Sequence, residues 1–180
     1  LENFAKSFDQ LVGLKPHEIQ LGILKRLRGV PLNRHNEKYQ LRYNPEPPYN
    51  ILRTRDIDFA TMQRVNRFAR FWDMIANSGR FKHTLPILLG DSAFDNFMQL
   101  SDGLYQTTGS TWKISLQRQF VMLFQALKNR ADVDEALLFE AMQQDYARSS
   151  EKTSFKSLLE AKGKVARVGV ANKRQQQMLQ

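Results

Sequence analysis

The sequence contains no cysteine. This absence excludes disulfides, thiolate zinc sites, cysteine-ligated iron–sulfur clusters and cysteine nucleophiles from these 180 residues. No apolar run approaches the roughly 18 uninterrupted residues that a membrane-spanning helix needs. The first residues, Leu1–Phe4, show neither the basic flank nor the apolar stretch of a signal peptide, and no initiator methionine precedes them. We therefore expect a segment of a longer cytoplasmic protein that makes no membrane contact.

Motifs for metal, nucleotide and hydrolytic chemistry are also missing. The three histidines, His17, His35 and His83, lie far apart and form no H-x-x-x-H or H-E-x-x-H pattern. Neither G-x-x-x-x-G-K-[ST] nor G-x-G-x-x-G occurs, so the sequence "RGVPL" at residues 28–32 is not a phosphate loop. No Ser/His/Asp arrangement stands out. The sequence therefore predicts no catalytic residue and no metal site of its own.

Basic residues exceed acidic ones. The chain has 27 Lys and Arg against 18 Asp and Glu, a formal net charge of +9. Such a balance favours contact with nucleic acid, small anions or an acidic partner domain. A solvated basic surface explains it equally well, and much of the excess lies near the C-terminus.

The chain begins with a predicted helix followed by a predicted strand. Within Leu1–Leu14, apolar residues recur at helical spacing, and Gly13 stands where a helix can end. Pro16 separates this helix from Ile19–Leu24, in which apolar and polar residues alternate as in a strand. This rhythm is typical of βα-repeat proteins. One such unit cannot bury itself, because a lone strand leaves its backbone groups unpaired.

Three basic residues, Lys25, Arg26 and Arg28, follow this strand directly. In α/β folds the carboxyl ends of the strands face the ligand crevice, so charges there often meet substrate. We therefore regard these three residues, together with Tyr49, as substrate-facing candidates. The alternative is that the basic side chains point outward to solvent.

Residues 33–56 are polar and rich in proline. The run "YNPEPPYNIL" excludes a helix and favours extended or polyproline conformations. Tyr39, Leu41 and Tyr43 alternate with polar residues, as do Tyr49 and Ile51, so a short irregular hairpin is the predicted structure.

From residue 57 to 148 the pattern predicts a bundle-like helical domain. Its helices are one capped by Asp58 and ending at Ser78-Gly79, a short one from Thr84 to Gly90, one opened by a Ser92/Asp95 capping box, one over Ser115–Asn129, and one opened by Asp132 with Glu135. The last helix should bury Leu137, Leu138, Ala141, Met142 and Tyr146. We interpret Asn77 as part of a C-terminal helix turn rather than as a functional residue.

Clean periodicity is lost after Ser149. Phe155, Leu158 and Leu159 are spaced to dock one more short helix. The rest of residues 149–180 is basic and rich in glutamine, and we expect a tail that is mobile or is ordered only against a partner.

Three arginines, Arg64, Arg67 and Arg70, lie on the first long helix of this domain, outside its apolar stripe. Arg53 lies upstream of the helix. Guanidinium groups bind phosphate or the RNA backbone, so these four residues are anion-binding candidates. The alternative is the solvated face of an amphipathic helix.

Three segments together resemble a known family. "HEIQLGILKRLRGVPL", "YNPEPPYNILRTRDIDFATMQRVNRFARFWDMIANSGRF" and "FDNFMQLSDGLY" are similar to the C-terminal part of cobalamin-binding radical S-adenosylmethionine proteins. In those proteins a cobalamin-binding domain is followed by a radical barrel and a helical C-terminal domain of unknown function. The resemblance covers residues 4–146.

The resemblance implies how the chain is divided. Residues 1–56 would be a remnant of the radical barrel with a Pro-rich connection, residues 57–148 the helical C-terminal domain, and 149–180 the tail. Ile19–Leu24 would be the sixth barrel strand, and Arg28-Gly29-Val30-Pro31 resembles the Pro-Gly-Thr-Pro turn that follows it, departing at Arg28 and Val30. The predicted fold is thus mainly α, with a short helix–strand remnant of a βα barrel.

The resemblance also implies cofactors for the parent protein: a [4Fe–4S] cluster, S-adenosylmethionine and cobalamin. The cluster needs the cysteines of C-x-x-x-C-x-x-C, so this chain cannot assemble it and should hold no cofactor. We expect a non-catalytic C-terminal portion that covers the barrel and helps to position substrate or a partner, its own partners being the upstream barrel and cobalamin domains. The alternative from another class is a basic α-helical module that binds RNA or DNA.

Overall fold

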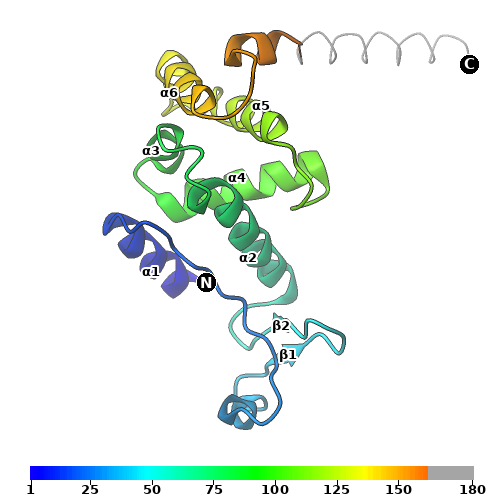
Figure 1. Cartoon of the computed structure of the whole chain (residues 1–180). Coiled ribbons are helices and arrows are strands. Elements are labelled where there is room, and N and C mark those ends of the chain that lie inside the picture. Colours follow the sequence, from blue (N-terminus) through cyan, green and yellow to red (C-terminus); the bar gives the residue numbers. More distant parts are fainter. Residues whose placement is uncertain (162–180) are drawn as a thin grey trace, which may run out of the picture. The chain divides into compact units, whose positions relative to one another are not determined.

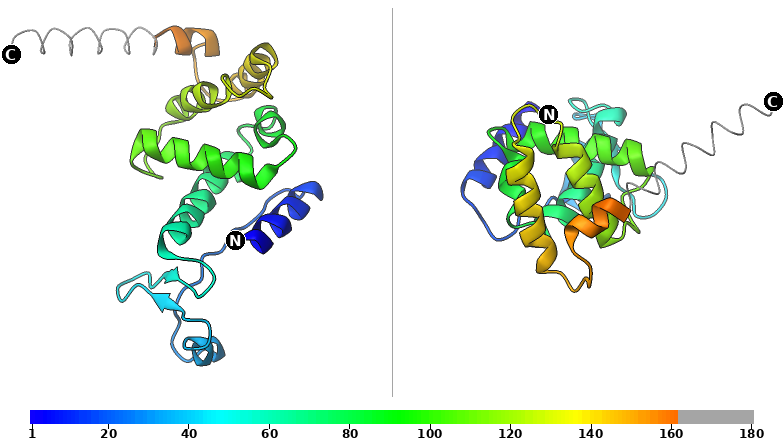
Figure 2. Two further views of the ribbon diagram at one scale, coloured as in Figure 1. Left: turned by 180° about the vertical axis from the view of Figure 1, so that it is seen from behind. Right: turned by 90° about the horizontal axis from the view of Figure 1, so that it is seen from above.

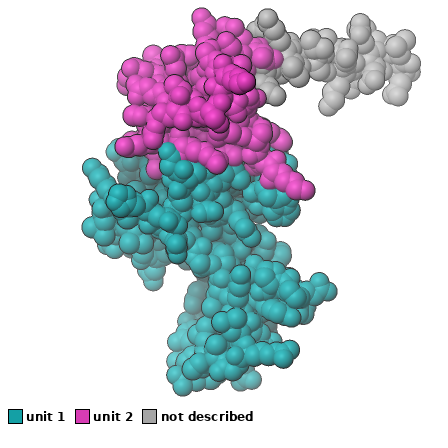
Figure 3. Space-filling model, in the orientation of Figure 1, with its two compact units in different colours: residues 1–79, 88–112 teal, residues 80–87, 113–180 magenta. Residues whose placement is uncertain are grey.

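A computed structural model describes residues 1–161 of the chain (Figure 1). This part is mainly helical and contains a single two-stranded sheet, as predicted. The chain forms two compact units, coloured separately in Figure 3. The first contains residues 1–79 and 88–112, and the second contains residues 80–87 and 113–161 of the described chain. The division predicted from the sequence, 1–56, 57–148 and 149–180, stays a prediction, and its first boundary falls inside the first unit.

Three helices build the first unit: α1 (Glu2–Gly13), α2 (Phe59–Trp72) and α4 (Ala93–Thr108). Both α1 and α2 pack against α4 (Figures 1 and 2). Their apolar faces share an aromatic core in which Phe8 is 1% exposed. The ring centroid of Phe8 lies 4.7 Å from that of Trp72 and 5.0 Å from that of Phe68. Edge-on aromatic pairs of this kind add to the hydrophobic gain of burial, so α1 is an integral part of this core.

The N-terminus of α2 is capped as predicted. The Asp58 carboxylate accepts a hydrogen bond of 2.7 Å from the backbone N–H of Thr61. This bond is the main reason why the pKa of Asp58 lies below its ordinary value. After Trp72 the helix continues as a π-helix (Asp73–Asn77), and the chain leaves it through Ser78 and Gly79, whose φ is +66°. The predicted end of this helix is thus confirmed.

The capping box predicted for α4 is wrong. Ser92 occupies the N-cap position, but its hydroxyl bonds the Asp95 carboxylate at 3.1 Å instead of a helix N–H. The backbone N–H of Phe94 donates instead to the carboxylate of Asp9, which lies on α1, at 2.7 Å. A neighbouring helix thus supplies the cap that local sequence was expected to supply.

The strand predicted over Ile19–Leu24 is also wrong. This segment is extended, but within the described chain it pairs only at its end, through an antiparallel bridge between Lys25 and Asn50. The bridge includes hydrogen bonds from Ile51 N–H to Leu24 O (2.9 Å) and from Arg26 N–H to Tyr49 O (3.0 Å). Alternation predicted an extended backbone correctly, whereas a strand also requires neighbours along its length.

The predicted hairpin is confirmed. Strand β1 (Arg42–Tyr43) pairs antiparallel with β2 (Ile51–Arg53), and a 3-10 helix (Pro31–His35) precedes it. Leu41 and Ile51 bury themselves against Met62 of α2. This small core attaches the hairpin to the helix.

The second unit contains α5 (Leu116–Leu127), α6 (Glu135–Ala147) and a further helical segment at 155–161. The predicted short helix is α3 (Thr84–Leu89); its residues 84–87 belong to the second unit and 88–89 to the first. Within the second unit, Asp145 is 1% exposed and accepts hydrogen bonds from the N–H groups of His83 and Thr84 and from the Thr84 hydroxyl. The ring of Phe120 packs on Tyr146 at 4.9 Å.

Two details of α6 differ from the prediction. The N-cap is Asp134, which accepts from the N–H groups of Ala136 and Leu137, whereas Asp132 bonds the side chain of Arg130 at 2.9 Å. Leu137, predicted to lie inward, is 60% exposed. The other four residues predicted to lie inward, Leu138, Ala141, Met142 and Tyr146, are buried, so the prediction is confirmed for them.

Phe155 and Leu158 are buried, as the predicted docking of a short helix requires. Residues 162–180 of the predicted tail lie outside the described residues, so its mobility stays a prediction. No helix in the described part is long and apolar enough to cross a membrane.

Candidate binding groove along α2

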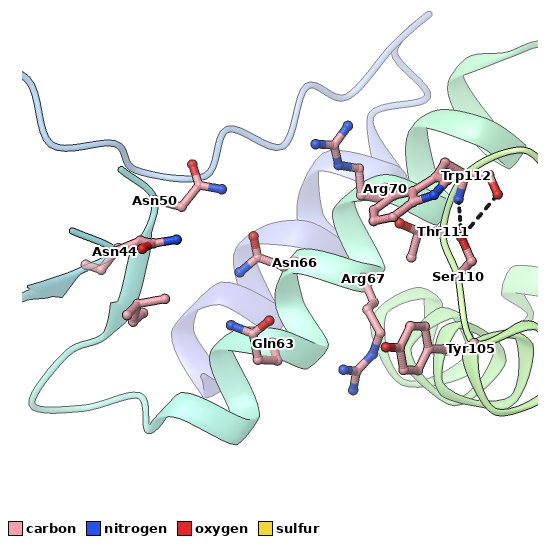
Figure 4. Close-up of a pocket in the computed structure, with 13 residues that line it drawn as sticks. Asn44, Asn50, Gln63, Asn66, Arg67, Arg70, Tyr105, Ser110, Thr111 and Trp112 are labelled. Atoms are coloured by element: carbon pink, nitrogen blue, oxygen red, sulfur yellow. Dashed lines mark hydrogen bonds between the residues drawn. The ribbon is translucent and has the colours of Figure 1, made fainter. Parts of the chain in front are cut away.

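One exposed face of α2 forms the floor of a polar groove of about 330 Å³ (Figure 4). Gln63, Asn66, Arg67 and Arg70 line it from α2. The hairpin side contributes Asn44 and Asn50, while Tyr105 of α4 and the loop Ser110-Thr111-Trp112 line the opposite side. All these residues belong to the first unit. We call this cavity the arginine–amide groove, and none of its lining residues carries a carboxylate.

Arg67 is held in place by two neighbours. Its guanidinium lies 3.6 Å from the Asp102 carboxylate and 4.5 Å from the ring centre of Tyr105, a cation–π distance. Its Nε atom is buried and has no hydrogen-bond partner. Such a buried donor is costly unless a ligand or water satisfies it.

Arg70 differs from its neighbours along the helix. It is exposed, and no described carboxylate forms an ion pair with it. Arg64 instead binds Asp102 at 2.7 Å. Arg53 stands on β2 opposite Arg42 and lines none of these cavities. Of the four anion-binding candidates, the fold therefore brings Arg67 and Arg70 together in one groove.

The amide side chains present both donors and acceptors. Asn44 uses its Oδ1 to accept from the N–H of Glu46 at 3.1 Å, which leaves its amide hydrogens for the groove. Asn66 donates to the carbonyl of Met62 at 2.7 Å, which leaves its oxygen as an acceptor. The Oδ1 atom of Asn50 is buried without a partner. The groove can thus hydrogen-bond a ligand that carries both kinds of polar group.

Trp112 is unusual because its side chain is 68% exposed. It follows α4 after Gly109, whose φ of +64° ends the helix. The loop is held by its own hydrogen bonds: the hydroxyl of Ser110 bonds the carbonyl and the N–H of Trp112, both at 3.2 Å. The indole is therefore presented on an ordered turn.

Sequence reasoning missed Trp112, Tyr105 and the amides. The sequence offered one signal of the groove, which was that Trp112 lies in a predicted turn, outside every apolar stripe. Periodicity marks residues that face a core, and it does not mark residues that face a groove.

A second groove of about 400 Å³ continues along α2, and both cavities share Asn50, Asn66 and Arg70. Lys25 lines this second groove. The other substrate-facing candidates do not: Arg26 and Arg28 are exposed, and Tyr49 is 42% exposed. Their assignment as substrate-facing stays a prediction.

Asn77 also lines this second groove. Its side-chain amide donates to the carbonyl of Ile19 at 3.1 Å and accepts from the N–H of Ile19 at 3.2 Å. The interpretation of Asn77 as only part of a helix turn therefore misses what its side chain does. It occupies the position that a neighbouring strand would take beside Ile19.

Metal or cluster binding by the described residues requires a group of ligating side chains. A [4Fe–4S] cluster is held by thiolates, and the sequence has none. In the part that the structure describes, no three His, Asp or Glu side chains gather in a possible metal site. The pKa of Asp132 is lowered, first because of its hydrogen bond with Arg130, but Asp132 lines neither groove. What the grooves offer chemically is binding, through guanidinium, amide and aromatic groups.

The structure defines a mainly α-helical protein with a small antiparallel hairpin and a polar groove along one helix. A family model, described as a protein of unknown function (DUF4080), matches residues 37–180. The chain therefore belongs to the DUF4080 family. All residues that line the arginine–amide groove fall within the matched part, whereas Lys25 precedes it. No curated protein and no solved structure matches the chain.

Proposed function

We propose that this chain is the non-catalytic C-terminal portion of a cobalamin-dependent radical S-adenosylmethionine enzyme. Its role is to cover the barrel of the parent protein and to help position a substrate or partner domain. The upstream barrel and cobalamin domains of the same polypeptide would hold the cluster, S-adenosylmethionine and cobalamin. Its cellular location is proposed to be the cytoplasm.

One observation carries the proposal: the three segments that resemble this enzyme family bind one another. Ile19, the third residue of the first segment, forms two backbone hydrogen bonds with the side-chain amide of Asn77 in the second segment. It pairs again at Lys25 with Asn50 of the Pro-Pro-Tyr run. The remaining segment is α4, which packs on α2. Segments that are distant in sequence thus form one folded unit around the two grooves, which supports treating the resemblance as a single inherited whole.

The first test concerns the parent protein. We expect the reading frame upstream of Leu1 to encode C-x-x-x-C-x-x-C. The complete protein, purified without oxygen, should contain iron and sulfide and convert S-adenosylmethionine to 5′-deoxyadenosine under reducing conditions. A reading frame without these cysteines would overturn the proposal.

A second test concerns Lys25 and Arg28. If they face the active site, Lys25→Glu together with Arg28→Glu should lower turnover of the complete enzyme at least about tenfold while its unfolding midpoint stays unchanged. Lys82→Glu, at an exposed position in the second unit, is the matched control and should leave turnover unchanged. Unchanged turnover in the double variant would remove both residues from the site.

A second candidate function, binding of RNA or DNA, is favoured by the charge around the hairpin. Residues 24–55 contain eight Lys and Arg but only two Glu. Phosphate neutralisation makes such binding steeply dependent on salt. A titration with generic RNA at about 50 and about 200 mM salt tests it, and no binding at the lower concentration would eliminate it.

A further inference from the structure

We propose that the arginine–amide groove binds a small anion that carries a planar ring, of the nucleoside monophosphate class. The inference depends on the groove alone and not on the link to radical enzymes. Its three components are an unpaired guanidinium charge, an exposed indole and a set of oriented amides.

The charge in the groove favours an anion. Arg70 has no ion-pair partner among the described residues, and Arg67 shares Asp102 with Arg64, which holds that carboxylate at the shorter distance, 2.7 Å against 3.6 Å. Both arginines line a cavity whose lining contains no acid. Guanidinium groups recognise phosphate oxygens through paired, charge-assisted hydrogen bonds. The buried Nε of Arg67 supplies one donor that the protein leaves unused.

The aromatic component favours a planar ring. A tryptophan that is 68% exposed on a hydrogen-bonded turn leaves apolar surface in water without a packing partner. In Figure 4 the indole of Trp112 lies near Arg70, on the side of the groove opposite Asn44 and Asn50. Base–indole stacking contributes about 1–3 kcal/mol per base in nucleic-acid complexes. A ligand that places its phosphate on Arg70 can place its ring on Trp112.

The side-chain amides in the groove can form hydrogen bonds with the polar groups of such a ligand. A nucleobase presents donors and acceptors along its edge, and ribose adds hydroxyls. Asn66 offers its side-chain oxygen as an acceptor, because its NH2 group already donates to the backbone. Asn44 offers its NH2 group as a donor, because its side-chain oxygen already accepts from the backbone. The volume of about 330 Å³ lies at the lower end of the range of small-molecule pockets. One mononucleotide is therefore the appropriate size class.

Tryptophan fluorescence provides a direct readout. The chain has two tryptophans, and Trp72 is only 4% exposed, so a change in emission on ligand addition reports Trp112. We expect adenosine 5′-monophosphate to quench the emission of the 180-residue chain saturably. Adenosine and inorganic phosphate, which each lack one component, should bind at least about tenfold more weakly. Calorimetric titration of the same ligands gives the affinity independently of the fluorophore.

Substitutions locate the binding. Arg70→Gln should weaken the affinity for adenosine 5′-monophosphate at least about tenfold, since a hydrogen bond to a charged group is lost. Arg53→Gln removes the same charge from an exposed position outside the groove and should have no effect. Trp112→Ala should abolish the quenching and weaken the calorimetric affinity. Neither Arg70 nor Trp112 is buried, so these variants should fold, which circular dichroism checks.

Several results would overturn the inference. One is the absence of both heat and quenching at about 5 mM nucleotide, well above ordinary metabolite affinities. Equal affinity for inorganic phosphate would reduce the groove to a simple anion site, and equal loss in Arg53→Gln would show nonspecific attraction. An octanucleotide that binds more than tenfold more tightly than the mononucleotide would assign the groove to RNA. None of these results bears on the cysteines upstream, so failure here and failure of the proposed function are distinguishable.

Discussion

The side-chain amide of Asn77 acts as a neighbour for an extended chain that otherwise pairs only at its end. Both backbone groups of Ile19 bond this one amide, across 58 positions of sequence. Ile19 is buried, so its N–H and C=O would be costly to leave unpaired. The interaction holds the segment that leads to Lys25 along α2. Asn77 at one end and the bridge at Lys25 at the other thus hold the segment that lines the second groove.

Asn77→Ala tests this role. We expect the free energy of unfolding to fall by about 1–3 kcal/mol, because the substitution leaves two backbone groups of Ile19 without partners. Urea unfolding followed by circular dichroism measures the change. Asn3→Ala, at an exposed position on α1, should change it by less than about 0.5 kcal/mol. Equal effects in both variants would contradict the pairing.

At the scale of the elements, helix caps come from two sources. Asp58, Ser115 and Asp134 cap their own helices through local side-chain bonds. Helix α4 is different, because Asp9 on α1 accepts the N–H of Phe94. The same bond joins two helices, so it contributes to packing as well as to the end of α4.

Asp9→Ala and Ser92→Ala distinguish the two possible caps of α4. Loss of a capping carboxylate should cost about 0.5–2 kcal/mol of unfolding free energy. Ser92→Ala should cost less than Asp9→Ala, since the Ser92 hydroxyl bonds only the side chain of Asp95. Urea unfolding of the two variants measures the difference. A larger loss in Ser92→Ala would show that the local capping box forms after all.

The cap of α2 predicts a dependence on pH. Because the N–H of Thr61 stabilises the ionised carboxylate, the pKa of Asp58 is lowered in the folded protein. The cap is therefore fully present above the ordinary aspartate pKa of about 3.9 and is lost as the pH falls through the lower folded value. Asn also caps helices but does not titrate in this range.

We therefore expect the thermal midpoint of Asp58→Asn to fall less than that of the unmodified chain when the pH decreases from about 5 to about 2.5. Thermal unfolding at a series of pH values measures it. Asp91→Asn, at an exposed position, should follow the unmodified chain. Identical profiles for all three proteins would mean that the Asp58 cap contributes no pH dependence.

At the scale of the whole molecule, the segment before the Pro-rich run belongs to the core of the first unit. Phe8 is fully enclosed by rings from α2 and α4. The first unit also extends across both the hairpin and α4. Removing residues 1–56 would therefore expose aromatic surface on helices that remain.

A chain that begins at residue 57 tests this dependence. In a Trp112→Phe background, Trp72 is the only tryptophan and lies 4.7 Å from Phe8. We expect its emission to shift to the red in the shortened chain and its urea unfolding to lose cooperativity, because losing a buried Phe alone costs about 3–5 kcal/mol. The full-length Trp112→Phe protein is the control. An unshifted emission with cooperative unfolding would instead support residues 57–148 as an autonomous domain.

Periodicity and local chemistry determined most of the helices. The apolar stripes of α2 and α5, the Asp58 cap and the Gly79 turn all depend on residues a few positions apart, so the sequence alone predicts them. The absence of cysteine likewise excludes a thiolate-held cluster on this chain without reference to any fold. The arginine candidates were recognised by residue type alone.

Only the tertiary structure decided which of these residues work together. It placed Arg67 and Arg70 in a groove with Trp112. Arg64 instead forms an ion pair with Asp102, and Arg53 lies on β2 opposite Arg42. It also replaced a predicted strand by an extended segment held by Asn77, and a predicted local cap by Asp9. The contacts of Arg64 with Asp102, Asn77 with Ile19 and Asp9 with Phe94 join positions from 38 to 85 residues apart. Local patterns carry no information on such partners, because a side chain's partner is selected by how the helices pack.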